Sequence, residues 1–566
     1  MTYVNAQPQG MATAAADLAA IGTTIDEASA AAARTTTGVA AAAADEVSTA
    51  VASVFDAYAQ DWRGLLGQAA LWQADFARAL AAAGNAYTGA EAANLAALAG
   101  SPATGGPALS ALTAPAFPNP YVTLVMGGSG MPIPPPDFVA NIVAKYVTPN
   151  FPAGLVQALA LPAGEYPDSG IKDLQQNISI ARGLTILDNA IHQQLAAGYA
   201  VNVVGYSQSA NIASLEMGFL DPTGTPSKLP IDFVLLGNSM NPNGGWDARF
   251  PGLSLPTLGL STLGAAPAND FLTKAYTIEY DGWADFPQYP IDVFSDLNAI
   301  AGMVTVHTGY DSLTPTQIGS ATVLPTQGPT MTTYYMIPTQ NLPLLEPVRY
   351  IPYLGNPIAD LVQPVLTPLV NWGYGSPDVG WSTGPANVPT PFGFLPPLSD
   401  TLALGPALAN GVPQGFAAAA HDLLVQGPPQ LPDLSQVVGL LSSGTGAPGL
   451  PASPPSITGV LAALQTANSQ IVGAGTTAFS TAYSTLLPTA DISTAALVSL
   501  PSYDVNLFLD GIGQMVDGQP VTGLINAFGN PIAADVGLLP FLGGLELAVL
   551  GEAGYSILTG MPYGSF

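Results

Sequence analysis

The feature that most constrains the fold is an alternation of strand-like and helix-like segments between residues 121 and 281. The strand-like runs, rich in Val, Ile, Leu and Tyr, are "YVTLVMGG" (121–128), "YAVNVVGYS" (199–207), "IDFVLLGN" (231–238) and "AYTIEYD" (275–281). The helix-like segments are "NISIARGLTILDNAIHQQLAAG" (177–198) and "SANIASLEMGFL" (209–220), while "LVQALALP" (155–162) is ambiguous. Because this alternation is typical of βαβ units, it predicts an α/β domain with a mostly parallel sheet over residues 121–375.

The first 98 residues have a different character, being rich in alanine. An alanine-rich segment at roughly 10–34 and apolar residues spaced three and four apart over 47–80 predict two helices that form an αα-hairpin. The second helix carries an apolar stripe that includes Tyr58, Trp62, Trp72 and Phe76. Two helices alone cannot bury this stripe, so we expect a partner helix from another chain or domain.

Two further regions complete the division of the chain. Residues 99–120 are rich in proline and glycine and are interpreted as a linker. Residues 376–566 are dominated by Pro, Gly, Ala and Leu, and no Lys or Arg follows Arg349. We expect short helices joined by proline loops there, partly wrapped on the α/β domain, with no role indicated by the sequence.

Charge and cysteine content exclude several classes of function. With 10 basic and 38 acidic residues and a net charge of -28, the chain lacks the basic clusters that nucleic acid or an anionic membrane requires. The absence of cysteine excludes disulfides, thiolate metal sites and cysteine nucleophiles. Only 8% of residues are charged and the mean hydropathy is +0.35, a balance that suits contact with lipid or with another protein.

Neither a signal peptide nor a membrane span is indicated by the sequence. The N-terminus lacks a basic region followed by an apolar core, which a cleavable signal peptide requires. The longest apolar stretch, 536–551, is interrupted by Pro540, Glu546 and several glycines. We therefore do not expect an integral membrane protein.

The strand at 199–207 ends in a pattern that suits a catalytic nucleophile. In Gly205-Tyr206-Ser207-Gln208-Ser209, small residues flank a serine at the point where a strand passes into a helix. α/β-Hydrolases place their nucleophile on such a turn, although serine here replaces the usual second glycine. The alternative is an ordinary turn between a strand and a helix.

A serine nucleophile needs a base, and the chain has three histidines. The order of residues in α/β-hydrolases is nucleophile, acid, histidine. His192 precedes Ser207 and lies in a helix, and His421 lies in the tail, so both are interpreted as surface residues. His307, at the end of the short β-like run "MVTV", is the predicted base.

The predicted acid lies between the serine and the histidine, in "YTIEYDGWADFPQYP". Asp281 directly follows the strand, and Asp285 follows Gly282 by three residues. Asp285 is favoured and Asp281 is kept as the alternative. Either carboxylate would orient His307 and stabilise its protonated form.

The predicted oxyanion donors are the N–H of Gln208, which follows the nucleophile, and N–H groups of Gly128 and Ser129 after the first strand. This chemistry calls for no metal and no cofactor. The segment 239–275, rich in Leu, Pro and Gly, is a candidate pocket wall or lid.

These motifs resemble a known family. "GYSQS", "GGSGMP", "YDGWADFPQYP" and "LPLLEPVR" resemble the PE-PPE serine hydrolase domain of mycobacterial proteins, which is related to cutinases. "IGTTIDEASAAAARTTTGVAAAAADEVS" and "YTGAEAAN", within residues 1–98, resemble the PE domain. The resemblance implies a secreted or cell-envelope serine esterase or lipase that acts on short- to medium-chain carboxylic esters.

The resemblance also implies export by type VII secretion, for which Tyr87 and Glu91 match the Tyr-x-x-x-Asp/Glu signal, and a PPE-type helical partner for residues 1–98. Two other functions stay open. An acyltransferase would pass the acyl group to a sugar or lipid hydroxyl. A non-catalytic surface protein would use the hydrolase scaffold for contact alone.

Overall fold

The computed structural model describes residues 120–171, 173–426 and 457–559, together with Ala52. The predicted N-terminal hairpin, the residues Tyr87 and Glu91, nearly all of the predicted linker and residues 427–456 of the tail lie outside the described residues. The described elements from β1 onward belong to one compact unit, Ala116–Phe566.

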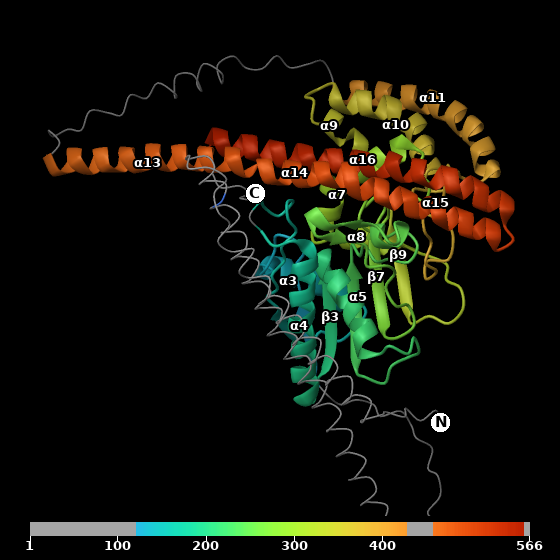
Figure 1. Cartoon of the computed structure of the whole chain (residues 1–566), viewed down its shortest axis with the longest axis horizontal. Coiled ribbons are helices and arrows are strands. Elements are labelled where there is room, and N and C mark those ends of the chain that lie inside the picture. Colours follow the sequence, from blue (N-terminus) through green and yellow to red (C-terminus); the bar gives the residue numbers. More distant parts are fainter. Residues whose placement is uncertain (1–51, 53–119, 172, 427–456, 560–566) are drawn as a thin grey trace, which may run out of the picture. The chain divides into compact units, whose positions relative to one another are not determined.

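A seven-stranded sheet forms the centre of this unit, in the order β2-β1-β3-β4-β7-β9-β8 (Figure 1). Six strands, β2, β1, β3, β4, β7 and β9, pair in parallel in that order, and the short β8 is antiparallel to β9. The expected mostly parallel sheet is therefore confirmed, and 155–162 contributes a strand. The strands are β1 (Tyr121–Val125), β2 (Leu155–Ala158), β3 (Ala200–Tyr206), β4 (Ile231–Leu236), β7 (Leu272–Ile278), β8 (Thr322–Val323) and β9 (Thr332–Ile337).

Helices cover both faces of the sheet because its strands are apolar on both sides. In β3, Val201 and Val203 pack into the core under α4 (Gln176–Ala196) and α5 (Gln208–Leu220). Val204 and Tyr206 enter the opposite core, formed with α3 (Pro136–Ile142) and the π-helical turn η1 (Val143–Val147). This period of two orients successive side chains toward opposite cores.

Further elements follow β4, β7 and β9. They are α6 (Trp246–Arg249), β5 (Ser254–Leu255), η2 (Pro256–Leu258), β6 (Leu260–Ser261), α7 (Val293–Thr305), η3 (His307–Gly309), α8 (Pro315–Gly319), η4 (Pro343–Leu345), α9 (Glu346–Arg349) and α10 (Gly355–Trp372). After β1 the chain runs to β2 on one side, and after β3 it runs to β4 on the other side. The order of the strands therefore switches between β1 and β3. In parallel sheets the crevice at the carboxyl ends of two such strands is the usual place for a ligand.

The tail differs from the expectation of short helices. Four of its described helices are long: α11 (Leu398–Gln426), α13 (Ile457–Ser484), α15 (Leu500–Val516) and the 40-residue α16 (Pro520–Thr559). The shorter α14 (Leu486–Thr494) and the π-helical turn η5 (Ala495–Ser499) lie between α13 and α15. α16 contains Pro531 and Pro540 within its length. Proline in a helix removes one backbone hydrogen bond, and the burial of the apolar face of α16 offsets that loss.

This burial occurs against the α/β part of the unit. One apolar core joins Trp246, Phe250 and Phe286 to Leu538 and Phe541 of α16. Figure 1 shows the orange and red C-terminal helices lying across one end of the sheet and its helices. By length and composition α16 could also cross a membrane, with a mean hydropathy of 1.7 in its most apolar stretch, of which 39% is buried.

Candidate active site

Ser207 lies in the turn between β3 and α5, at the crevice described above. Its φ of 57° and ψ of -126° are unusual for a residue other than glycine. The turn is tight because β3 and α5 meet at Gly205, where an added Cβ would lie 2.6 Å from the Cα of Ala210. The serine that replaces the second glycine, Ser209, is buried and exchanges hydrogen bonds with the backbone of Tyr206. The local geometry is that of a nucleophile elbow.

His307 faces Ser207 across the crevice. Its Nε2 lies 2.8 Å from Ser207 Oγ, and its ring is buried and stacks on the ring of Tyr206 at 5.8 Å between centroids. The Tyr206 hydroxyl donates to the carbonyl of His307 at 3.0 Å. These contacts hold both the imidazole and its backbone beside the serine.

The local structure around His307 differs from the expected β-like run. Met303, Val304 and Thr305 are the last residues of α7, and His307 begins the 3₁₀ turn η3. Asp292 is the N-cap of α7, and its side chain accepts from the N–H of Phe294. The packing of α7 against the core outweighs the weak strand preference of its β-branched residues.

Asp281 is the carboxylate that contacts His307. Both of its oxygens lie 2.8 Å from His307 Nδ1. Oδ2 also accepts from the Tyr310 hydroxyl at 2.7 Å, and Oδ1 accepts from the N–H of Trp283 at 3.1 Å. Donors from three directions therefore fix the carboxylate against the imidazole.

The preference for Asp285 as this partner is wrong. Asp285 Oδ2 accepts from the N–H of Tyr280 at 3.1 Å, so its side chain is directed toward the start of the turn and away from His307. The Asp285 N–H donates to the carbonyl of Asp281, one helical turn earlier. The turn is held in place by Gly282, where an added Cβ would lie 2.1 Å from the carbonyl oxygen of Ala299 on α7.

The predicted oxyanion residues gather at the same crevice. An added Cβ at Gly128 would lie 3.0 Å from Ser207 Cβ, so the loop after β1 passes directly beside the serine. Gln208 begins α5, and its side-chain Nε2 donates to Ser129 Oγ at 3.3 Å and to the carbonyl of Gly164 at 2.8 Å. The side chain of Gln208 is thus engaged away from the serine. The oxyanion roles of Gln208, Gly128 and Ser129 stay predictions.

Two residues of the site were missed by the sequence reasoning. Tyr310 fixes Asp281, and its position three residues after the histidine was the only signal. Glu165 lines a small cavity with Ser207 and His307. Nothing in the sequence near Glu165 indicated this, because only the packing of the segment after β2 brings it to the crevice.

The pKa of Glu165 is raised to about 7: burial is the largest cause and the nearby Asp168 adds to it, whereas the hydrogen bond from Ser129 and the charge of His307 partly oppose the rise. For His307, burial lowers the pKa. The charge and hydrogen bond of Asp281, with the charges of Glu165 and Asp168, outweigh burial, so the pKa is raised above 6.5.

The expected role of His307 as a general base predicts how catalysis depends on pH. Only the neutral imidazole can take a proton, and the raised pKa means that this form prevails only above about pH 6.5. We expect kcat/KM to rise with pH, with its midpoint above that value. Glu165→Gln removes the negative charge that Glu165 carries when it is ionised, and should therefore move the midpoint to lower pH.

The measurement is kcat/KM for one ester across pH, for the wild type and for Glu165→Gln. Asp517→Asn is the charge-matched control, because Asp517 is exposed in the turn between α15 and α16. It should leave the midpoint unchanged. A midpoint that stays fixed or moves upward in Glu165→Gln would contradict the electrostatic account.

Comparison with known proteins gives two family matches: the PE family over residues 4–94 and the PE-PPE domain over residues 152–375. Three relatives come from Mycobacterium tuberculosis (strain ATCC 25618 / H37Rv). The PPE family protein PPE28 is 48% identical over 79% of this chain and 68% of its own length. "Esterase PE16" is 40% identical over 73% of this chain and 76% of its own length. "Diacyltrehalose acyltransferase Chp2" is 28% identical over 58% of this chain and 90% of its own length.

Both families match this one chain, and its alignments with PPE28 and Esterase PE16, at 48% and 40% identity, cover more than two thirds of each relative. The chain belongs to the PE family and carries a PE-PPE domain.

Proposed function

We propose that this protein is a serine carboxylic-ester hydrolase that acts on short- to medium-chain esters through an acyl-Ser207 intermediate. The observation that carries the proposal is the hydrogen-bonded series Ser207, His307, Asp281 at the elbow, with 2.8 Å between Ser207 Oγ and His307 Nε2. The name "Esterase PE16" of a relative that is 40% identical supports the same reaction class.

In the first half of the reaction, His307 Nε2 takes the proton of Ser207 while Oγ attacks the ester carbonyl carbon. The carbonyl oxygen becomes an oxyanion, which the N–H groups of Gln208 and of the Gly128–Ser129 loop would stabilise. Asp281 orients the imidazole and stabilises its positive charge. The intermediate then collapses: the bond to the alcohol oxygen breaks, the alcohol leaves with the proton from His307, and the acyl group stays on Ser207.

In the second half, water gives a proton to His307 and attacks the acyl carbon. The bond to Ser207 breaks, the carboxylic acid leaves, and Ser207 regains its proton. The test is turnover of p-nitrophenyl butyrate by the full chain, with loss of turnover in Ser207→Ala. Equal turnover in both proteins would overturn the proposal.

Acyl transfer is the second candidate, because the relative named "Diacyltrehalose acyltransferase Chp2" aligns over 90% of its own length. A sugar or lipid hydroxyl would then replace water in the second half. Adding trehalose or glycerol to the same assay and measuring the ratio of ester to free acid among the products distinguishes the two. Product that is mainly ester at millimolar acceptor would favour transfer.

We further propose that the protein is secreted or held in the cell envelope after type VII export, with a PPE-type partner on residues 1–98. Membership of the PE family and the Tyr87-x-x-x-Glu91 spacing support this proposal. Tyr87→Ala should reduce the secreted fraction of the protein, measured by immunoblot of culture filtrate against cell lysate. Unchanged secretion in this variant and in a deletion of residues 1–98 would contradict the route.

A further inference from the structure

A second, larger cavity lies next to the small one at Ser207. Its volume is about 270 Å³, slightly below the usual range for ligand pockets. Tyr166, Trp283 and Met303 of the α/β part form one side, and Phe541, Leu545 and Ala548 of α16 form the other. Apart from Glu165 and Asp168 its lining is largely apolar, which suits a hydrocarbon chain rather than a sugar.

This cavity adjoins the small cavity at Ser207. Glu165 and Trp283 line both the larger cavity and the small one that contains Ser207 and His307. Thr308, the residue after His307, also lines the larger cavity. A chain attached to Ser207 Oγ that extends past Trp283 would reach the apolar space.

The wall formed by α16 is built into the core of the protein. The ring of Phe541 packs on Trp246 at 5.5 Å and on Trp283 at 5.7 Å between centroids. The helix lies close to the α/β part at two glycines, Gly537 and Gly544. An added Cβ at Gly537 would lie 2.9 Å from Pro290 Cβ, and one at Gly544 would lie 3.3 Å from Ile300 Cγ2.

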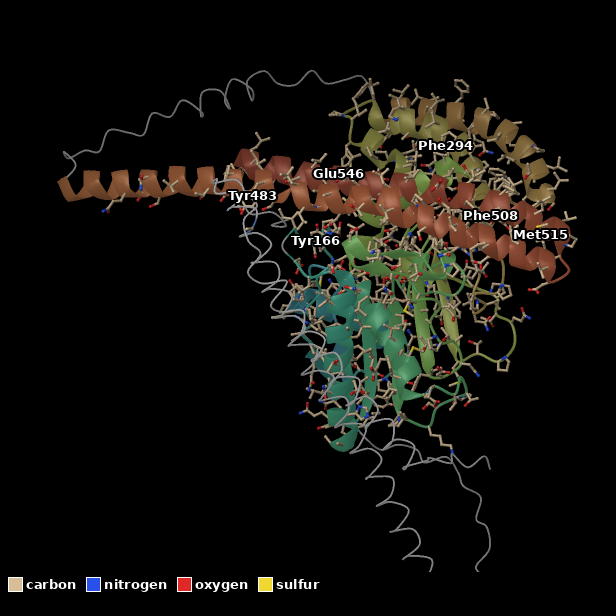
Figure 2. The ribbon with its side chains drawn as sticks, viewed as in Figure 1. Tyr166, Phe294, Tyr483, Phe508, Met515 and Glu546 are labelled. Carbon is tan, nitrogen blue, oxygen red and sulfur yellow. The ribbon has the colours of Figure 1, made fainter. Side chains whose placement is uncertain are left out.

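Hydrogen bonds from neighbouring elements reinforce this placement. The Tyr166 hydroxyl donates to Asp491 Oδ2 at 2.7 Å, which joins the segment after β2 to α14. The Thr489 hydroxyl of α14 donates to Glu546 Oε1 of α16 at 2.8 Å. Figure 2 shows Tyr166 and Glu546 at this junction, beneath and within the C-terminal helices. The segment 239–275, the candidate wall from the sequence, contributes Leu260 to the cavity.

We propose that α16 forms the acyl-binding wall of this enzyme, with Phe541, Leu545 and Ala548 contacting the hydrocarbon chain of the ester. The inference rests on the proposed function, and it assigns a role to the tail, which lies outside the two family matches at 4–94 and 152–375. The selectivity for acyl chains thus depends in part on residues beyond the PE-PPE domain.

The size and charge of the cavity define the class of chain. A methylene group occupies about the volume of one liquid water, roughly 30 Å³, so 270 Å³ admits a chain on the order of eight to ten carbons. The carboxyl groups of Glu165 and Asp168 in the lining favour an uncharged chain over one that ends in a carboxylate. The expected substrate is an ester of a medium-length fatty acid.

The test fills the cavity from its solvent side. Ala548 is exposed at the edge of the cavity, so Ala548→Trp adds bulk there without changing the buried core. Leu547→Trp is the matched control, because Leu547 is 72% exposed and does not line the cavity. Both variants are made in the full chain and checked for an unchanged thermal unfolding midpoint.

The first readout is kcat/KM for p-nitrophenyl acetate, butyrate, octanoate and decanoate. Because each buried methylene contributes about fourfold, displacing two of them should lower the decanoate-to-acetate ratio at least about tenfold in Ala548→Trp. Leu547→Trp should keep the wild-type ratio. The second readout is calorimetric binding of 1-decanol, an uncharged chain, to the same variants in a Ser207→Ala background, where no chemistry occurs.

The outcomes separate the acyl site from the proposed function. A lowered ratio and weaker decanol binding in Ala548→Trp alone support the site. Normal ester turnover with an unchanged ratio and unchanged decanol binding overturns the site and leaves the function standing. Decanol binding that depends on Ala548, in a wild type that hydrolyses no ester, keeps the site and removes the function.

Discussion

Replacing Ser207 with alanine should lower kcat/KM for p-nitrophenyl butyrate by about 10⁴-fold or more, because the hydroxyl is the proposed nucleophile. The fold should persist, since the substitution removes one oxygen whose partner is His307 Nε2 and keeps the Cβ that the elbow already accommodates. Steady-state kinetics and thermal unfolding of both proteins provide the measurement. Ser254→Ala, at an exposed position in β5, is the matched control and should behave as wild type.

Substituting the histidines tests the same mechanism. His307→Ala should lose activity to a similar degree, because no other side chain lies in position to take the Ser207 proton among the contacts described for the site. His192 is exposed on α4 beside Asp188, and His421 is exposed on α11, so alanine at either position should be nearly silent. A fully active His307→Ala with an unchanged unfolding midpoint would rule out the proposed mechanism.

The second large effect is expected at Asp281. Asp281→Asn should lower kcat by about 10⁴-fold, because the amide removes the charge that stabilises the imidazolium and can hold the ring in the wrong tautomer. Asp285→Asn should keep kcat within a few-fold of the wild type. Burial raises the pKa of Asp285 well above its ordinary value, so the neutral asparagine is a close replacement, and its oxygen can still accept from Tyr280.

The two variants control for each other, since each changes one buried aspartate of the same turn into its isostere. kcat is measured above the acidic limb of the pH profile, together with the unfolding midpoint. An inactive but folded Asp285→Asn, beside an active Asp281→Asn, would mean that the turn rearranges when substrate binds.

The elbow and the sheet could be predicted from the sequence because both depend on local physics. A strand that ends in small residues at Gly205 and passes into a helix at Gln208 allows few backbone paths, and alternating apolar runs specify parallel strands. His307 could be chosen by elimination, because the chain contains three histidines and the order along the chain excluded His192. For this residue, its type and its place in the order along the chain were enough to predict the base.

Three features of the proposed site were decided by the tertiary structure. They are the choice of Asp281 as the acid, the position of Glu165 beside Ser207, and the acyl-binding wall on α16. Asp281 and Asp285 lie four residues apart in one turn, and the packing of Gly282 on α7 decides which of them faces His307. Composition predicted short helices in the tail. The apolar core that α16 shares with Trp246 and Trp283 offsets its internal prolines, so the helix continues past them and reaches the cavity beside Ser207. Such burial depends on contacts between segments hundreds of residues apart, and no local pattern encodes it.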